Sequence, residues 1–299
     1  MHGGHGATPD RSASHGDETS RSASARLVEN GHPRGGANVP PEEGWYRETR
    51  IADTSSAFIC VWTHRAGSAP ARVIPDNHAD FIVSSAGAAW LVGPATSVDL
   101  PEIEPGTVLR GLRIHTASLR AVTGVDGAEL RDRALPVADL LPSRKARTLV
   151  DVLDPTDVAE AMDAANPTDV MVAAPPDLRA LWPDAGADAR VREAVRLLSG
   201  GGGGGIDAVA RTVALTPRHL RRLVERETGL GPKTLQRVGR LQRALHVIRE
   251  GGPLTLADVA SSVGYADQAH FAHDVRRFTG RTPRAYLASR PPESPRSRK

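Results

Sequence analysis

The sequence has 299 residues, of which 39% are hydrophobic and 24% charged, with a formal net charge of +3. A chain of this length is expected to form about two domains. Its single cysteine, Cys60, excludes an internal disulfide and a four-cysteine metal site. No stretch approaches the roughly 18 apolar residues that a membrane helix needs, and the N-terminus lacks the apolar segment of a signal peptide, so we expect a cytoplasmic location.

The charge is divided unevenly along the chain. Residues 190–290 carry 18 Arg and Lys against 8 Asp and Glu, a net charge of +10, whereas the remaining residues carry a net charge of −7. A basic part joined to an acidic part is typical of a nucleic-acid-binding half combined with a half of another function.

The chain begins with a polar tail and continues with short β segments. Residues 1–41 are rich in Gly, Ser, His, Arg and Pro, and we expect them to be disordered because they cannot bury enough apolar surface. Residues 42–145 are expected to form a β-rich domain, a small barrel or sandwich, with strands at 58–62, 71–74, 80–83, 88–92 and 108–114. Trp62, Phe81 and Trp90 are candidate walls of a ligand pocket there, and each is equally well explained as core.

An enzymatic role finds little support in this region. Metal-dependent cupin enzymes present a His-x-His pair followed by Glu, and no His-x-His occurs in the sequence. A set made of His64, His78, Asp80 and His115 is the alternative that remains, against the simpler interpretation of a polar turn before a buried strand. The glycine run at 200–205 lacks the Lys-Ser/Thr of a phosphate loop and is expected to be a flexible joint. We therefore predict no catalytic residue, no metal and no cofactor.

A connector with helical character follows at 146–186. Its apolar positions are broken into short pieces by Pro155, Pro167, Pro175, Pro176 and Pro183. The next helix, with Val191, Val195 and Leu198 on one face, is expected to begin a domain at 187–290 that ends before a disordered tail at 291–299.

The C-terminal domain repeats itself at an offset of 50 residues. Ile206, Val209, Ala210 and Val213 occupy one helical face, and the same pattern returns at 256–263. In the first copy, Thr216 and Pro217 are expected to start a second, basic helix. Two short helices joined by a tight turn, of which the second is basic, predict a helix-turn-helix. The duplication therefore predicts two such units.

The second unit carries different outward-facing residues, and one helix joins the two units. Asp267 is expected to cap its second helix, and Gly280 to end it. The joining helix, at 232–249, has 18 residues and a length of roughly 27 Å. With the width of the flanking units this approaches the roughly 34 Å of one turn of DNA.

A family resemblance rests on this second unit. The run Gly-Tyr-Ala-Asp-Gln-Ala-His-Phe at 264–271 continues at 276–283 as Arg-Arg-Phe-Thr-Gly-Arg-Thr-Pro. Together they resemble the signature of AraC-type transcription regulators, which covers about the last hundred residues. The chain departs from the family at His273 and Val275, where Arg and Phe are frequent. The resemblance implies an all-α domain in which two helix-turn-helix units read two successive major grooves of double-stranded DNA.

The family's reading positions fall on residues of the two second helices. The residues expected to contact DNA are Thr216, Arg218, Arg221, Arg222, Arg226, Gln268, His270, His273, Arg276 and Arg277. Arg commonly reads guanine and Gln reads adenine in the major groove.

A second, shorter resemblance concerns the N-terminal half. The run IPDNHADFIV at 74–83 is similar to a motif of one branch of AraC-type regulators, which has a cupin-like N-terminal domain. The resemblance implies an α+β chain whose N-terminal domain responds to a small molecule or a partner. Dimerisation and contact with RNA polymerase stay open. The rival hypotheses are a metal-dependent cupin enzyme fused to a DNA-binding domain, and a DNA-binding protein without a sensor role.

Overall fold

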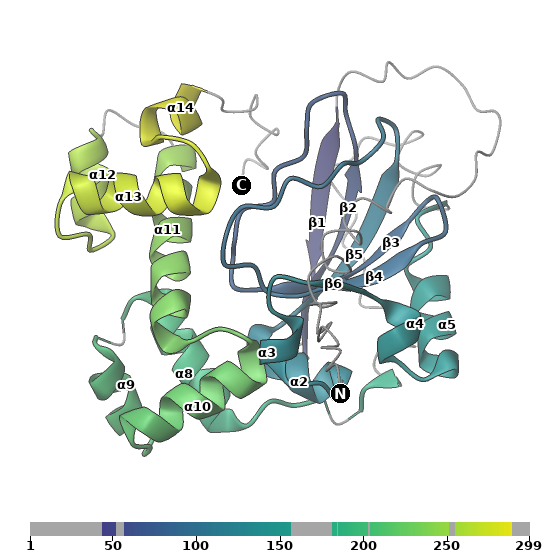
Figure 1. Cartoon of the computed structure of the whole chain (residues 1–299), viewed down its shortest axis with the longest axis horizontal. Coiled ribbons are helices and arrows are strands. Elements are labelled where there is room, and N and C mark those ends of the chain that lie inside the picture. The colour runs from purple at the N-terminus through teal and green to yellow at the C-terminus, as the bar shows by residue number, and fades with distance from the viewer. Residues whose placement is uncertain are drawn as a thin grey trace, which may run out of the picture.

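The computed structural model describes residues 44–51, 57–156, 181–183, 185–202, 204–250 and 255–288. In these residues an antiparallel sheet is followed by a helical domain, so the predicted α+β class is confirmed. The sheet lies on one side of the long helix α11 (Pro232–Glu250), and the two groups of short helices lie at its ends (Figure 1). The expected disordered tails and most of the expected connector lie outside the described residues.

In the described residues, six strands form one sheet. They are β1 (Trp45–Arg50), β2 (Phe58–Arg65), β3 (Ala79–Ser84), β4 (Ala89–Val92), β5 (Val108–Ile114) and β6 (Ala134–Pro136). Their order is β1-β2-β5-β3-β4-β6, and every pairing is antiparallel. The strand predicted at 71–74 does not form, because Val73 makes only an isolated bridge with Asp99. β1 and β6 lie at the two edges of this sheet, and a cupin-like domain stays a prediction.

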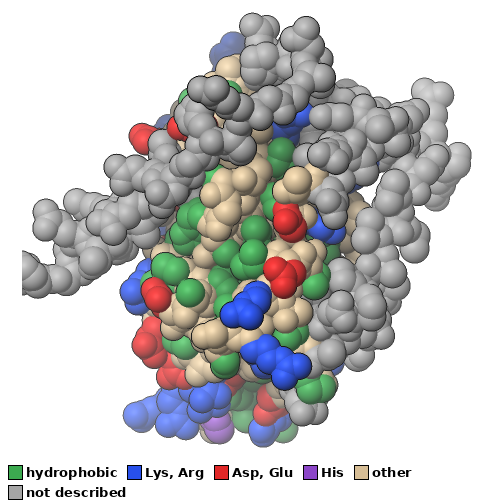
Figure 2. Space-filling model, turned by 90° about the vertical axis from the view of Figure 1, so that its right-hand side faces the viewer, with side chains coloured by type: hydrophobic (Ala, Val, Ile, Leu, Met, Phe, Trp, Pro, Cys, Tyr) green, Lys and Arg blue, Asp and Glu red, His purple; other side chains and the backbone are tan. Residues whose placement is uncertain are grey.

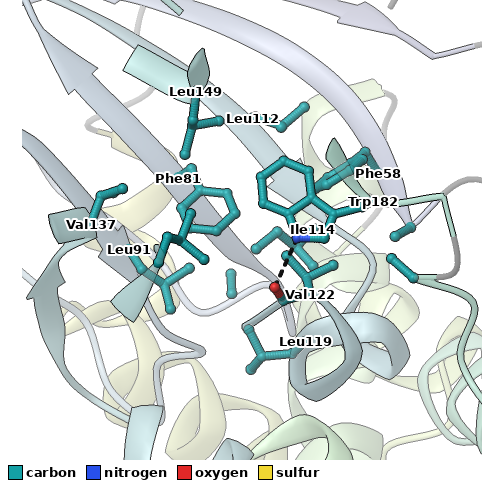
Figure 3. Packing of buried hydrophobic residues seen from close by; sticks show 14 of the residues in the cluster. Phe58, Phe81, Leu91, Leu112, Ile114, Leu119, Val122, Val137, Leu149 and Trp182 are labelled. Carbon is teal, nitrogen blue, oxygen red and sulfur yellow. Dashed lines mark hydrogen bonds between the residues drawn. The ribbon is translucent and has the colours of Figure 1, made fainter. Parts of the chain in front are cut away.

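One face of the sheet forms the core of the N-terminal domain. The short helical turns η2 (Thr116–Ser118), α2 (Leu119–Thr123), α3 (Gly127–Leu130) and α4 (Val137–Leu140) follow the strands, and α5 (Ser143–Val152) contributes Leu149 to the core. Trp182, from the segment that leads into the next domain, stacks on Phe81 with 5.8 Å between ring centroids (Figure 3). Its indole N–H donates to the main-chain oxygen of Val122 at 2.9 Å. The segment that enters the C-terminal domain is thereby fixed to the N-terminal core.

The C-terminal domain contains the predicted duplication. After α8 (Ala189–Gly200), the first unit consists of α9 (Ile206–Thr212) and α10 (Pro217–Thr228). The second unit consists of α12 (Leu256–Ser262) and α13 (Gln268–Thr279), followed by α14 (Pro283–Ala288). Each unit has its own apolar core, and α11 contributes Leu235 to the first and Val238, Leu241 and Leu245 to the second. The two units are therefore separate bodies that share one helix.

Side-chain caps and glycines set the bounds of the two recognition helices. The hydroxyl of Thr216 accepts from the N–H of His219, and the carboxylate of Asp267 accepts from the N–H of His270. These caps satisfy N–H groups that have no partner in the first helical turn. Gly229 and Gly280 end α10 and α13 with φ angles of 76° and 68°. The predicted boundaries are confirmed.

The N-terminal domain packs directly on the first unit. Ala117 of η2 belongs to the apolar core of that unit. Gly127 of α3 lies so close to the end of α10 that a Cβ built on it would be 2.2 Å from the N atom of Gly229. Charged side chains of both signs lie among hydrophobic ones on the opposite face of the domain, turned away from α11 (Figure 2).

Candidate nucleic-acid interface

The first unit presents three arginines on the outer face of α10. Arg218, Arg221 and Arg222 follow the i, i+3, i+4 spacing that places side chains on one side of a helix. All three are exposed, whereas Leu220 and Val224 on the opposite side are buried. Within the described ranges, these arginines form no ion pair. They are therefore available to bind phosphates or base edges.

The remaining residues predicted on this unit have additional roles. Thr216 is exposed and caps α10, so its hydroxyl is engaged by the helix itself. Arg226 is exposed and pairs with Glu227 at 2.8 Å. A surface hollow of about 320 Å³ lies between Arg222 and Arg226, lined also by His219 and Leu223.

The second unit presents polar residues at the start and end of α13. Gln268, His273, Arg276 and Arg277 are exposed. His270 is half-buried, and its ring meets the edge of Tyr265 with 5.1 Å between centroids. Nine of the ten predicted contact residues are thus exposed and the tenth is partly accessible, on two equivalent helices at opposite ends of α11.

The arginines of α11 bind other parts of the protein. Arg237 pairs with Asp274 of α13 at 2.5 Å, and Asp274 is fully buried. Arg243 donates to the main-chain oxygen of Ser199 in α8 at 2.5 Å. The guanidinium of Arg240 lies 5.0 Å from the ring centre of Tyr265, whose pKa is raised by burial and by the nearby Asp274. These residues fix the two units on α11.

The Arg237–Asp274 pair is not among the contacts predicted from the sequence. Asp274 follows His273 in a helix rich in polar residues, so its burial is set by the tertiary packing of α13 on α11. One signal could have indicated the burial of Asp274. It lies three residues after Phe271 and four before Phe278, so helical periodicity places it on the apolar face that these residues form with Val275.

The spacing of the units suits the dimensions of DNA. α11 has 19 residues, which corresponds to about 28 Å. α10 and α13 lie at its two ends (Figure 1). This length is comparable to the roughly 34 Å of one turn of the duplex.

The three predicted pocket residues of the N-terminal domain do not share one face of the sheet. Trp62, Gly111, Ile82 and Trp90 are aligned across the strands. Phe81, next to Ile82, points to the opposite face and belongs to the main core. Trp62 covers Gly111 closely, since a Cβ on that glycine would lie 2.0 Å from the indole ring.

The face that carries Trp62 also holds a half-buried charged network. The indole N–H of Trp62 donates to Asp80 at 2.7 Å, and Arg113 contacts Asp80 and Asp76 at 3.2 Å each. Burial lowers the pKa of Arg113, but these two carboxylates outweigh that effect and raise its pKa above the ordinary value. The nearby Cys60 is fully buried, and burial raises the pKa of its thiol to about 12. Its thiol is therefore held protonated at neutral pH.

The histidines considered for a metal site are dispersed in other contacts. His78 lies 3.4 Å from the hydroxyl of Thr116, and Nδ1 of His115 accepts from the N–H of Ala117. Among the residues that the structure describes, no three His, Cys, Asp or Glu side chains come together in a group that could hold a metal ion. No helix in the same residues is long and apolar enough to cross a membrane.

Comparison with known proteins identifies the C-terminal domain. A family model described as a helix-turn-helix domain matches residues 209–289. The HTH-type transcriptional regulator GlxA of Rhizobium meliloti is 33% identical over 76 residues, which are 25% of this chain and 23% of that protein. The HTH-type transcriptional activator RhaS of Escherichia coli is 35% identical over 78 residues, 26% of this chain and 28% of that protein. The chain thus matches about a quarter of the length of these curated relatives.

Solved structures include proteins of the same type. An AraC-type transcriptional regulator of Chromobacterium violaceum is 25% identical, with a TM-score of 0.31. The match covers 33% of this chain and 89% of that regulator's chain. ToxT of Vibrio cholerae is 10% identical, covers 82% of this chain and 97% of its own, and has a TM-score of 0.42. The C-terminal domain is therefore a helix-turn-helix domain similar to those of HTH-type transcriptional regulators.

Proposed function

We propose that the chain is a transcription regulator that binds a bipartite DNA site, with α10 in one major groove and α13 in the next. The observation that carries this proposal is the pair of equivalent helices at the ends of α11, each with exposed groups that bind phosphates or bases. Arg218, Arg221 and Arg222 suit guanine or phosphate in one groove, and Gln268 and His273 suit the other. This is a regulatory role in the cytoplasm and not an enzymatic one.

Selection of bound sequences from a randomised duplex library tests the proposal. We expect two enriched half-sites whose centres are separated by about 10 base pairs. We also expect the selected duplex to be bound at least about a thousandfold more tightly than random DNA. A chain that enriches no sequence would contradict the proposal.

We further propose that the N-terminal domain senses a small organic molecule at the face of the sheet that carries Trp62 and Trp90. The support for this is the combination of buried aromatic rings with a half-buried charged group, Arg113, since effector sites place a few polar groups among apolar walls. A thermal-shift screen would detect a ligand that binds the folded state. If no effector binds and removal of residues 1–185 leaves regulation unchanged in the cell, a DNA-binding protein without a sensor role is the better description.

Two partners complete the proposal. The first is a second copy of the chain, which would form a dimer through the acidic N-terminal half. The second is RNA polymerase, through which the DNA-bound protein would alter transcription. Sedimentation of the purified chain with and without its selected duplex measures the first of these.

A further inference from the structure

Residues 72–77 form an extended segment that lies between the sheet and α11 and contacts both helix-turn-helix units. We name this segment the brace. It precedes β3, so it belongs to the N-terminal domain in the sequence. It runs antiparallel to α11: Asn77 meets the beginning of that helix, Pro75 meets its middle, and Arg72 reaches the end of α13.

At the first unit, the contact is made by a buried asparagine. The side-chain amide of Asn77 donates to the main-chain oxygen of Leu235 at 3.0 Å and to the hydroxyl of Ser199 at 3.2 Å. Asn77 is 3% exposed and has a φ of 67°, the left-handed conformation that Asn adopts more readily than most residues. Its amide therefore bridges α8 and α11, the two helices that support the first unit.

At the second unit, the brace makes two polar contacts and one apolar contact. The side-chain amide of Gln242 donates to the main-chain oxygen of Pro75 at 2.6 Å. Ile74 packs against the apolar core of the second unit. Arg72 donates to the main-chain oxygen of Thr279, the last residue of α13, at 2.7 Å. The last carbonyl groups of a helix have no partner within it, and a cation is favourable there.

The brace is itself fixed to the sheet. Asp76 pairs with Arg113 at 3.2 Å, and Arg113 is held on the sheet by Asp80. The hydroxyl of Thr116 donates to the main-chain oxygen of Asn77. Both anchors are buried or half-buried, so the position of the brace follows the position of the sheet.

The arrangement has a consequence for DNA binding because the two units have separate cores. Without the brace, α11 alone would set the distance and angle between α10 and α13. The contacts at Leu235 and Gln242 are seven residues apart on α11, about 10 Å along its axis. The contact at Thr279 then adds a constraint on the recognition helix itself.

We infer that Asn77, Gln242 and Arg72 are positioning residues that fix the spacing between the two DNA half-sites that the protein accepts. None of them lies on the outer face of a recognition helix, so they act through α11 and α13. This inference rests on the proposed function, and it adds that the N-terminal domain selects operators by their spacing. The polar network around Arg113 is the link through which the sheet sets that spacing.

The test measures binding to duplexes that contain the selected half-sites at the optimal spacing and at one and two base pairs more or less. Asn77→Gly removes both hydrogen bonds and keeps a residue that tolerates positive φ. Gln242→Ala introduces a strong helix former at a half-buried site, so the fold is retained. Each variant should reduce the discrimination between optimal and altered spacing by about fivefold, the equivalent of one net hydrogen bond. In the triple variant that also carries Arg72→Ala, the discrimination between optimal and altered spacing should fall by more than tenfold.

Matched controls separate this effect from general damage. Gln236→Ala removes a glutamine of the same helix that bonds within its own unit, to the main-chain oxygen of Gly204. Arg133→Ala removes an arginine that bonds within the N-terminal domain, to the main-chain oxygen of Glu129. Both should keep the wild-type preference for spacing. A loss of stability alone would weaken binding at every spacing equally and would count against the inference.

A distance measurement provides a second readout without DNA. Spin labels on cysteines introduced at Arg222 and His273, in a chain that carries Cys60→Ser, report the distance between the two units. The distribution should broaden in Gln242→Ala and stay narrow in Gln236→Ala. Equal distributions together with unchanged spacing preference would overturn the inference. If the wild-type chain selects no DNA sequence at all, it is the proposed function that fails, and the distance measurement still tests the brace.

Discussion

Arg237 of the joining helix forms an ion pair with Asp274 of the second recognition helix, and the two side chains differ in their access to water. The carboxylate is fully buried, whereas the side chain of Arg237 is 22% exposed. Arg237 donates to Oδ1 of Asp274, and Oδ2 has no hydrogen-bond partner in the described part of the chain, so Arg237 is the main compensation for this buried carboxylate. The position of α13 on α11 therefore depends on this pair.

The two single variants should differ in stability. Arg237→Ala leaves a buried carboxylate without its partner and should lower the free energy of unfolding by about 3 kcal/mol. Asp274→Ala leaves an arginine that can reach water and should cost less, about 1–2 kcal/mol. Urea unfolding of the two variants measures the difference. Equal losses would mean that the pair is more hydrated than its burial indicates.

The exposed arginines of α10 should contribute to specific binding. Arg222→Ala should weaken binding to the selected duplex by about 1–3 kcal/mol and relax the preference at one base position. Competition assays with the selected and the random duplex give both values. Arg196→Ala, which removes an arginine paired with Glu193 on α8, is the control and should bind as the wild type does. Equal weakening on both duplexes would assign Arg222 to a phosphate contact.

Salt should weaken binding steeply. If the domain neutralises roughly six phosphates, its affinity should fall on the order of a thousandfold between 50 and 200 mM salt. The slope of log affinity against log salt concentration gives the number of phosphates contacted. An affinity for DNA that does not change with salt concentration would contradict the assignment of the basic surface of the two units as the DNA-binding surface.

The stability of the domain interface should fall on mild acidification. Burial lowers the pKa of His115, and the nearby His78 and Arg192 lower it further. The unfolded chain, with a His pKa of about 6.5, therefore takes up the proton first as the pH falls. The free energy of unfolding is therefore unchanged above about pH 6.5. It decreases as the pH falls from there through the lower pKa that His115 has in the folded chain.

The variant His115→Asn tests this dependence. Asparagine retains an acceptor for the N–H of Ala117 and cannot be protonated in this range. Urea unfolding at pH 7.5 and 5.5 should show a smaller loss in the variant than in the wild type. His246→Asn removes an exposed histidine of α11 and is the control. If the wild type and His115→Asn lose the same free energy of unfolding between the two pH values, His115 is not the group responsible for the acid sensitivity.

The C-terminal fold could be predicted almost completely from the sequence because its signals are local. The caps at Thr216 and Asp267 and the glycines at 229 and 280 determine helix ends through their own hydrogen bonds and dihedral angles. The exposed faces of α10 and α13 follow from helical periodicity in the same way.

The contacts between the domains could not be predicted because they join residues far apart in the sequence. Asn77 and Leu235 are separated by 158 positions, and Arg72 and Thr279 by 207. The segment 71–74 has the composition of a strand, but Arg72 and Ile74 contact the second unit, and Val73 makes only an isolated bridge with Asp99. Phe81 and Trp62 are both predicted as walls of one pocket from their residue type. The alternation of side chains along the strands, together with the strand register, places them on opposite faces of the sheet.

Methylation interference on the selected duplex tests the central claim most directly. Methyl groups on guanine N7 block contacts in the major groove, so they reveal which turns of the duplex the protein reads. We predict two clusters of interfering guanines about 10 base pairs apart, with interference at one position of the α10 cluster lost in Arg222→Ala. A single cluster of interfering guanines would contradict the reading of two successive grooves by the two units.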